Sequence, residues 1–213
     1  IGIKDIHPPK RMEISPYVAS TGKFLLHDPL DPFNIGHNYT GSVGADLKLG
    51  LGSNMTLNAT INPDFGQVEV DPAVVNLSQY ETFFDEKRPF FVEGSNFFEF
   101  GRGGANSNWG FKWGNPNFYY SRRIGRPPGG SVQHSDDDGQ GDRFSEVPDR
   151  THIVAAAKVT GKATDGWPIA ALEAVTARES AMTDSAGHRF VDVVEPLTSF
   201  TVVRTVKEFE AGR

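Results

Sequence analysis

The feature that most constrains this chain is a pair of alternating segments separated by a short polar turn. Apolar and polar or small residues alternate over 44–51 (GADLKLGL) and again over 55–61 (MTLNATI), with 52–54 (GSN) between them. A two-residue period places alternate side chains on opposite faces of a strand, and a short turn containing glycine joins antiparallel strands. The sequence therefore predicts a β-hairpin here.

A second hairpin is predicted nearer the C-terminus. Residues 153–159 alternate, and 167–178 continue as a strand after the turn at 161–166. That turn ends in Asp165-Gly166, a pair that favours the positive φ angles of tight turns. Residues 198–209 (TSFTVVRTVKEF) form a further predicted strand.

Residues 10–20 (KRMEISPYVAS) are a weaker strand candidate. Pro16 predicts an edge strand or a bulge there, because proline cannot donate a ladder hydrogen bond. In total we predict a mainly β chain, an antiparallel meander of about six strands that forms a partial or open barrel-like sheet.

The predicted connections differ in length. The turns at 52–54 and 161–166 are short, whereas 21–42, 63–152 and 179–197 are long. Outer-membrane barrels have short turns at one end and long loops at the other. A soluble β-sandwich can also mix loop lengths, so both architectures remain open.

Two charged residues complicate the barrel interpretation. Glu173 shares a face with Ile169 and Val175, and Arg204 shares a face with Val202. A lysine or arginine that faces lipid at mid-membrane costs about 2–4 kcal/mol, and a carboxylate costs less. The alternation alone does not decide which face of these two strands would point outward.

Six strands are also fewer than the eight with which single-chain bacterial barrels begin. An open sheet edge in lipid would leave backbone groups unpaired. Residues 1–10 have no signal-peptide pattern, and 210–213 resemble the start of a turn. We therefore expect either a part of a longer chain or a chain that does not span a membrane by itself.

The domain prediction is a single β-rich domain, 1–213, in which 63–152 is a long insertion that acts as a plug or a surface lid. Ser78 and Glu81 have the capping-box spacing, which predicts one short helix over 78–87 that stops before Pro89. Phenylalanine pairs at 83–84, 90–91 and 97–98 predict a small aromatic core within the insertion.

Charged side chains concentrate in the same insertion: Asp64, Glu69, Asp71, Glu81, Asp85, Glu86, Lys87, Arg88 and Glu93. One interpretation is a carboxylate-lined site for a metal or a sugar, or the two carboxylates of a glycoside hydrolase. The other is a network of ion pairs and helix caps that holds the insertion in place.

The segment 118–126 places arginines beside aromatic residues, with Tyr120, Arg122 and Arg123 as binding candidates. These side chains could bind anionic sugars or lipid headgroups. Alternatively the arginines pair with the carboxylates of the insertion, because the guanidinium group suits bidentate ion pairs.

An acidic stretch at 136–142 has oxygen ligands at alternate positions, as Ca²⁺ requires. The candidate ligands are Asp136, Asp138, Gln140 and Asp142, but the twelfth position of the loop is Val147 rather than glutamate. A solvated acidic loop is the alternative. The six histidines are scattered and form no zinc motif.

Composition excludes several classes of protein. The chain has 213 residues with 21 Lys+Arg against 27 Asp+Glu, a net charge of -6 that argues against nucleic acid as a partner. The absence of cysteine excludes disulfides and thiolate metal sites. No apolar run is long enough for a membrane-spanning helix.

Four stretches of the chain resemble the bacterial family called domain of unknown function 5916. They are 62–94 (NPDFGQVEVDPAVVNLSQYETFFDEKRPFFVEG), 118–128 (FYYSRRIGRPP), 155–167 (AAAKVTGKATDGW) and 194–209 (VEPLTSFTVVRTVKEF). The resemblance implies an outer-membrane β-barrel of Gram-negative bacteria. Many members carry an N-terminal carbohydrate-binding-like module and are loosely labelled hydrolases, but the family supplies no catalytic residues.

Our leading hypothesis is a non-enzymatic, barrel-like segment of the Gram-negative cell envelope, in the outer membrane or facing the periplasm, with a role in binding or transport and a glycan as the expected ligand. The first alternative is an accessory structural subunit docked on a larger membrane-protein assembly. The second is a glycoside hydrolase that uses carboxylates of 64–93. Calcium is the only cofactor that the sequence raises.

Overall fold

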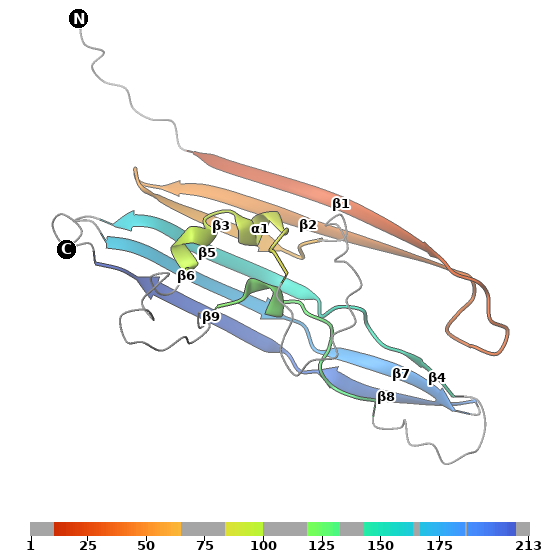
Figure 1. Ribbon diagram of the computed structural model, residues 1–213. Coiled ribbons are helices and arrows are strands. Elements are labelled where there is room, and N and C mark those ends of the chain that lie inside the picture. The colour runs from red at the N-terminus through yellow and green to blue at the C-terminus, as the bar shows by residue number, and fades with distance from the viewer. Residues whose placement is uncertain are drawn as a thin grey trace, which may run out of the picture.

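The computed structural model describes residues 11–64, 84–99, 119–132, 143–163, 167–185 and 187–207. Six antiparallel strands form the main sheet in the order β1-β2-β3-β5-β6-β9 (Figure 1). Their bounds are β1 Met12–Phe24, β2 His37–Leu51, β3 Met55–Ile61, β5 Ile153–Ala163, β6 Trp167–Thr176 and β9 Thr198–Thr205. The prediction of an antiparallel meander of about six strands is confirmed.

Both predicted hairpins are present. The strands β2 and β3 pair across the turn at 52–54, with Leu47 opposite Ala59. The strands β5 and β6 pair from Ile153 and Thr176 to Ala163 and Trp167. The long insertion separates β3 from β5 in sequence, yet these strands are also neighbours. Within the described residues the sheet is open, with β1 and β9 at its edges.

Pro16 lies in an edge strand, where its missing N–H is tolerated. It is in β1, which pairs only with β2 among the described strands, and the register of this pair runs without a shift from Met12 to Phe24. An edge strand tolerates a residue without an N–H on its free side. Of the two predictions for Pro16, the edge strand is therefore confirmed and the bulge is not.

The prediction of a long connection over 179–197 is wrong. This segment is a hairpin of β7 (Glu179–Ser185) and β8 (His188–Glu195), and β4 (Arg143–Glu146) joins it in a three-stranded sheet. The two-residue alternation of these strands does not show in the sequence, because small or polar residues occupy buried positions. Ala181 and Thr183 are fully buried, and Asp192 is 8% exposed.

Two other boundaries also differ from the prediction. The connection expected over 21–42 is shorter, because β1 extends to Phe24 and β2 begins at His37. Of the helix predicted over 78–87, the described residues 84–87 are not helical. The helix α1 instead spans Pro89–Val92, because the missing N–H and fixed φ of proline suit the first turn of a helix.

The two faces of the six-stranded sheet have different surroundings. On the face that we call the inner face, α1, η1 (Ser95–Phe98) and η3 (Ser121–Arg123) lie across the strands (Figure 1). We call the described segments that carry them, 84–99 and 119–132, the inner cover. The core lies between the cover and the sheet and consists of Phe91, Phe98, Ile124, Ile153, Ala156, Ala170, Leu172 and Ala174.

The outer face is opposite the inner cover. The strand register places Leu47, Leu57, Ala157 and Ala171 on this face, in alternation with the residues of the core. Many of its large apolar side chains are exposed, among them Met12, Ile14, Val18, Val43, Leu51, Ile61 and Val203. In the described ranges, the sheet therefore buries one face under its own chain, while the apolar face has no segment over it.

Candidate functional site

Arg88 joins the two segments of the inner cover. The Arg88 guanidinium donates from Nε and Nη2 to the two carboxylate oxygens of Glu86, at 2.8 and 2.7 Å. The same group donates to the backbone carbonyls of Ser121 at 2.8 Å and Ile124 at 2.6 Å. Because Arg88 and Glu86 belong to one segment and Ser121 and Ile124 to the other, this network joins the two segments of the cover.

The Glu86 carboxylate is mostly buried, with 14% of its side chain exposed. Burial alone would raise the pKa of Glu86, but the hydrogen bonds and the charge of Arg88, together with the Ser121 hydroxyl, hold it below its ordinary value. The Ser121 hydroxyl donates to Glu86 Oε2 at 2.5 Å. The carboxylate is therefore ionised and engaged with its neighbours rather than placed to act as an acid.

Two further contacts connect the same segments. The Tyr120 hydroxyl accepts a hydrogen bond from the Phe84 N–H at 2.8 Å and donates to the Phe84 carbonyl at 3.1 Å. Arg122 Nη1 donates to the Asp85 carbonyl at 2.6 Å. Burial, together with the charge of nearby Arg150, lowers the pKa of Arg122. These contacts favour the interpretation in which the charged residues hold the insertion in place.

A row of inward-facing residues fastens the cover to the sheet. The register aligns Lys48 of β2, Asn58 of β3 and Lys158 of β5. Lys158 is 2% exposed, and its ammonium group donates to the backbone carbonyls of Phe90 and Glu93 at the end of α1. Lys48 forms an ion pair with the Glu93 carboxylate at 2.5 Å. The sheet thus caps the C-terminal end of this helix with cations.

Arg204 of β9 makes a similar contact. Its Nη1 donates to the Phe97 carbonyl in η1 at 3.0 Å. The side of β9 that carries Arg204 therefore faces the inner cover, which decides the orientation that the sequence left open. Glu173 of β6 is on the opposite, outer face, where the hydroxyls of Ser199 and Thr201 donate to its carboxylate.

The structure brings some of the predicted site residues together and leaves others apart. Glu86, Arg88, Tyr120 and Arg122 meet in the inner cover, where Lys87 and Arg123 are their more exposed neighbours in sequence. Glu93 instead contacts Lys48 of β2 through its side chain and Lys158 of β5 through its backbone carbonyl.

Asp64 lies at the end of β3, where its carboxylate accepts from the Ser42 hydroxyl at 3.1 Å. Its N–H donates to the Tyr17 hydroxyl at 3.3 Å. The described carboxylates of 64–93 are therefore spread over three places.

The other predicted residues lie outside the described residues. They are Glu69, Asp71 and Glu81 of the insertion and the calcium candidates Asp136, Asp138, Gln140 and Asp142. Within the described ranges, no group of three or more His, Cys, Asp or Glu is placed to hold a metal ion.

Lys48 and Lys158 are functional-site residues that were not predicted from the sequence. Each is the one charged residue in the middle of an otherwise apolar or small stretch, LKL and AAAKVT. A charge at a strand position that faces inward needs a partner when it is buried. That isolated position was a usable signal, although the partner, a pair of backbone carbonyls, could not be read from the sequence.

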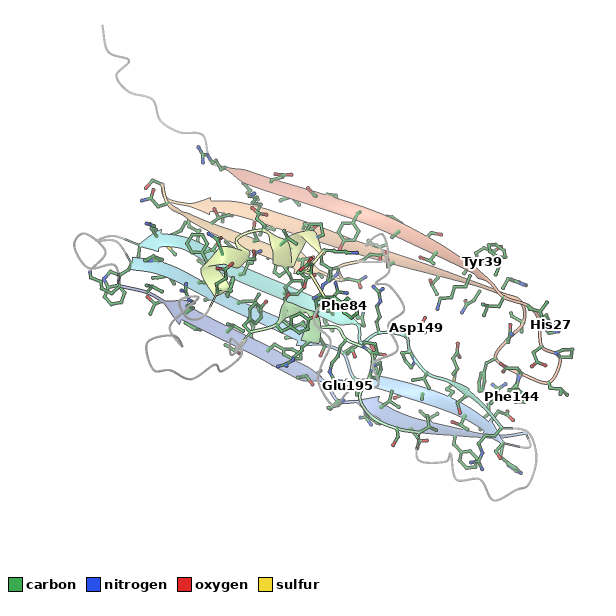
Figure 2. All side chains as sticks on the ribbon, in the orientation of Figure 1. His27, Tyr39, Phe84, Phe144, Asp149 and Glu195 are labelled. Atoms are coloured by element: carbon green, nitrogen blue, oxygen red, sulfur yellow. The ribbon has the colours of Figure 1, made fainter. Side chains whose placement is uncertain are left out.

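The outer face has aromatic residues near both ends of its strands. Phe24 and Tyr39 pack edge to face, with ring centroids 5.8 Å apart, beside the connection 25–36 (Figure 2). Trp167 is on the same face at the opposite end, where β6 begins, and is 39% exposed. The apolar residues of the outer face therefore lie between two aromatic positions.

The described residues define an antiparallel β protein with an inner face covered by its own insertion and an exposed, apolar outer face. The chain belongs to the family described as Domain of unknown function (DUF5916), whose family model matches residues 8–211. No curated protein and no solved structure matches the chain. In the part of the chain that the structure describes, no helix is long and apolar enough to cross a membrane.

Proposed function

We propose that the chain is a section of the wall of an outer-membrane-type β-barrel, with its outer face against lipid and the inner cover as a plug. The observation that carries this proposal is the asymmetry of the sheet: the apolar face is exposed, and the face with Lys48, Lys158 and Arg204 is turned toward the chain's own insertion. A water-soluble sheet would bury the apolar face instead.

The dimensions of the strands support the proposal. A tilted transmembrane strand needs about 9–11 residues. The strands β1, β2, β5 and β6 have 13, 15, 11 and 10 residues. Aromatic residues typically mark both membrane interfaces of a barrel, and the exposed Trp167 and Tyr39 near opposite ends of the outer face fit this pattern.

In lipid, the free edges of β1 and β9 would have to be paired, because unsatisfied backbone groups cost several kcal/mol each. The proposed barrel therefore needs further strands beside both edges, from the same longer polypeptide or from a partner. Its expected location is the envelope of a Gram-negative bacterium. Its expected role is non-enzymatic binding or transport, with a glycan as the ligand suggested by the family resemblance.

Neighbouring residues of β3 provide a direct test. Leu57 faces outward and Thr56 faces inward, and the chain has no cysteine of its own. Leu57→Cys and Thr56→Cys variants are labelled with an environment-sensitive dye and reconstituted into vesicles together with the strands that complete the barrel. We expect a blue-shifted emission at 57 only, together with quenching by nitroxides on the acyl chains. Equal emission at both positions, or quenching at 56 alone, would contradict the proposal.

A second candidate is an accessory subunit docked on a membrane-protein assembly. Glu173 favours it, since a carboxylate on the outer face suits contact with protein better than contact with lipid. The two candidates differ at Thr201, beside Glu173. A photo-crosslinker at 201 should label lipid if the sheet is part of a barrel wall, and a stoichiometric protein partner if the chain is an accessory subunit. The same probe at Leu47, elsewhere on the outer face, is the control.

A further inference from the structure

The inner face of the sheet has two unlike halves. From β5 to β9 its side chains are mostly small or apolar, with Lys158 and Arg204 as charged exceptions, and Ala170 and Ala174 are completely buried under the inner cover. On β1 and β2 it carries the charged side chains Glu13, Asp46 and Lys48, which are exposed, whereas Asn58 and Thr60 on the same face of β3 are buried. Among the described residues, inward side chains of β3, β5 and β6 are therefore buried, while the charged side chains of β1 and β2 stay exposed.

Two cavities follow this charged part of the inner face along the strands. The first has a volume of about 470 Å³, lies at the 52–54 turn and is lined by Arg11, Glu13, Lys48 and Thr56 among others. The second, of about 250 Å³, lies between the sheet and the cover, and its lining includes Glu13, Lys48, Asp46 and Glu93. Because Glu13 and Lys48 line both cavities, the two adjoin at these residues.

The ion pair between Lys48 and Glu93 is at that junction. The Nζ to Oε1 distance is 2.5 Å, and each of the two side chains is 49% exposed. An ion pair that is exposed to solvent contributes little free energy, so its two side chains separate easily. The backbone of Glu93 stays anchored by the buried Lys158, so the side-chain pair can separate without releasing the cover.

We propose that these two cavities form a route past the cover for small, neutral, polyhydroxylated solutes of the size of a monosaccharide, and that the ion pair of Lys48 and Glu93 is its gate. The inference rests on the proposed function, since a route has meaning only if the sheet is part of a barrel wall. The lining carries both signs of charge, with Arg11 and Lys48 against Glu13, Asp46 and Glu93. Pores that select an ion present charges of one sign, so this mixed lining favours an uncharged solute.

The test is swelling, in iso-osmotic glucose, of vesicles that contain this chain together with the strands that complete the proposed barrel. We expect slow swelling with the wild type and at least threefold faster swelling with Lys48→Met and with Glu93→Gln. The matched control is Lys23→Met, which breaks another exposed ion pair, with Asp149, outside both cavities. That variant should swell at the wild-type rate.

The double variant Lys48→Glu/Glu93→Lys rebuilds the pair with its charges exchanged. It should return the swelling rate toward that of the wild type, which separates gating from general damage to the fold. A double variant as fast as the single ones would overturn the gate.

Flotation of the same vesicles, together with the labels at 56 and 57, reports on the proposed function separately. A chain that floats and shows the outward label in lipid, but admits no glucose in any variant, would overturn the route and leave the barrel proposal standing. If the chain does not float even with the strands that complete the barrel, both proposals are overturned.

Discussion

The ammonium group of Lys158 donates hydrogen bonds to the backbone carbonyl of Glu93, and Lys48, two strands away, pairs with the carboxylate of the same residue. One residue of the insertion is thus held at its backbone by β5 and at its side chain by β2. The buried contact determines where the cover lies, and the exposed one is free to separate.

Lys158→Met should destabilise the protein. The substitution leaves the carbonyls of Phe90 and Glu93 without their donor, and hydrogen bonds to a charged group are worth about 1.5–3 kcal/mol. Chemical denaturation measures the change in the free energy of unfolding. Lys162→Met, at an exposed position of the same strand, is the control and should change it by less than about 0.5 kcal/mol.

Arg88→Lys should loosen the two segments of the inner cover. Lysine keeps the charge but cannot donate to Glu86 in a bidentate manner while also reaching the carbonyls of Ser121 and Ile124. We expect a loss of about 1–3 kcal/mol and faster proteolysis within 84–99. The exposed neighbour Lys87→Ala serves as the comparison, and equal proteolysis of both variants would show that Arg88 does not join the segments.

Stability should fall in acid because of Glu86. The folded-state pKa of Glu86 is lowered, so its contribution is present at pH values above the ordinary carboxyl pKa and is lost as the pH falls through the lower, folded value. Thermal unfolding of the wild type and of Glu86→Gln between pH 7 and 3 measures this. The difference between the two should shrink toward acid, and a constant difference would exclude Glu86 as the source.

Gly44→Ala should be poorly tolerated. A Cβ at this position would lie 2.5 Å from the Asn62 carbonyl oxygen and 2.5 Å from the Tyr17 ring, which packs over the glycine. Overpacking of this kind costs about 1–3 kcal/mol. Gly41→Ala in the same strand is a matched control, because its Cβ would meet only the Ala19 carbonyl at 3.9 Å. Similar losses at 44 and 41 would indicate a general effect of alanine rather than a clash.

The parts of the fold that could be predicted are those with a strong local signal. The segments 44–51 and 55–61 alternate through leucines and end at a polar turn, and Pro16 identifies an edge strand through its missing N–H. The hairpin of β7 and β8 was not predicted. Its buried positions include Ala181, Thr183 and Asp192, so hydrophobicity does not alternate along these strands.

From the sequence, the candidate site could be predicted only as a list of residues and not as an arrangement in space. Glu86, Arg88, Tyr120 and Arg122 were all identified, but their mutual contacts depend on bringing 84–88 beside 120–124. Sequence spacing carries no information on that approach, because the two segments are far apart in the sequence.

The sequence by itself determined the antiparallel strands, since a two-residue period and turn residues act locally on the backbone. Only the tertiary structure decided which face is covered. Alternation shows that a strand has two different faces, but it does not show which one the rest of the chain will occupy. Here the insertion packs on the face that carries Lys158 and Arg204, because these cations satisfy its backbone carbonyls, and the leucines of β2 remain on the uncovered face.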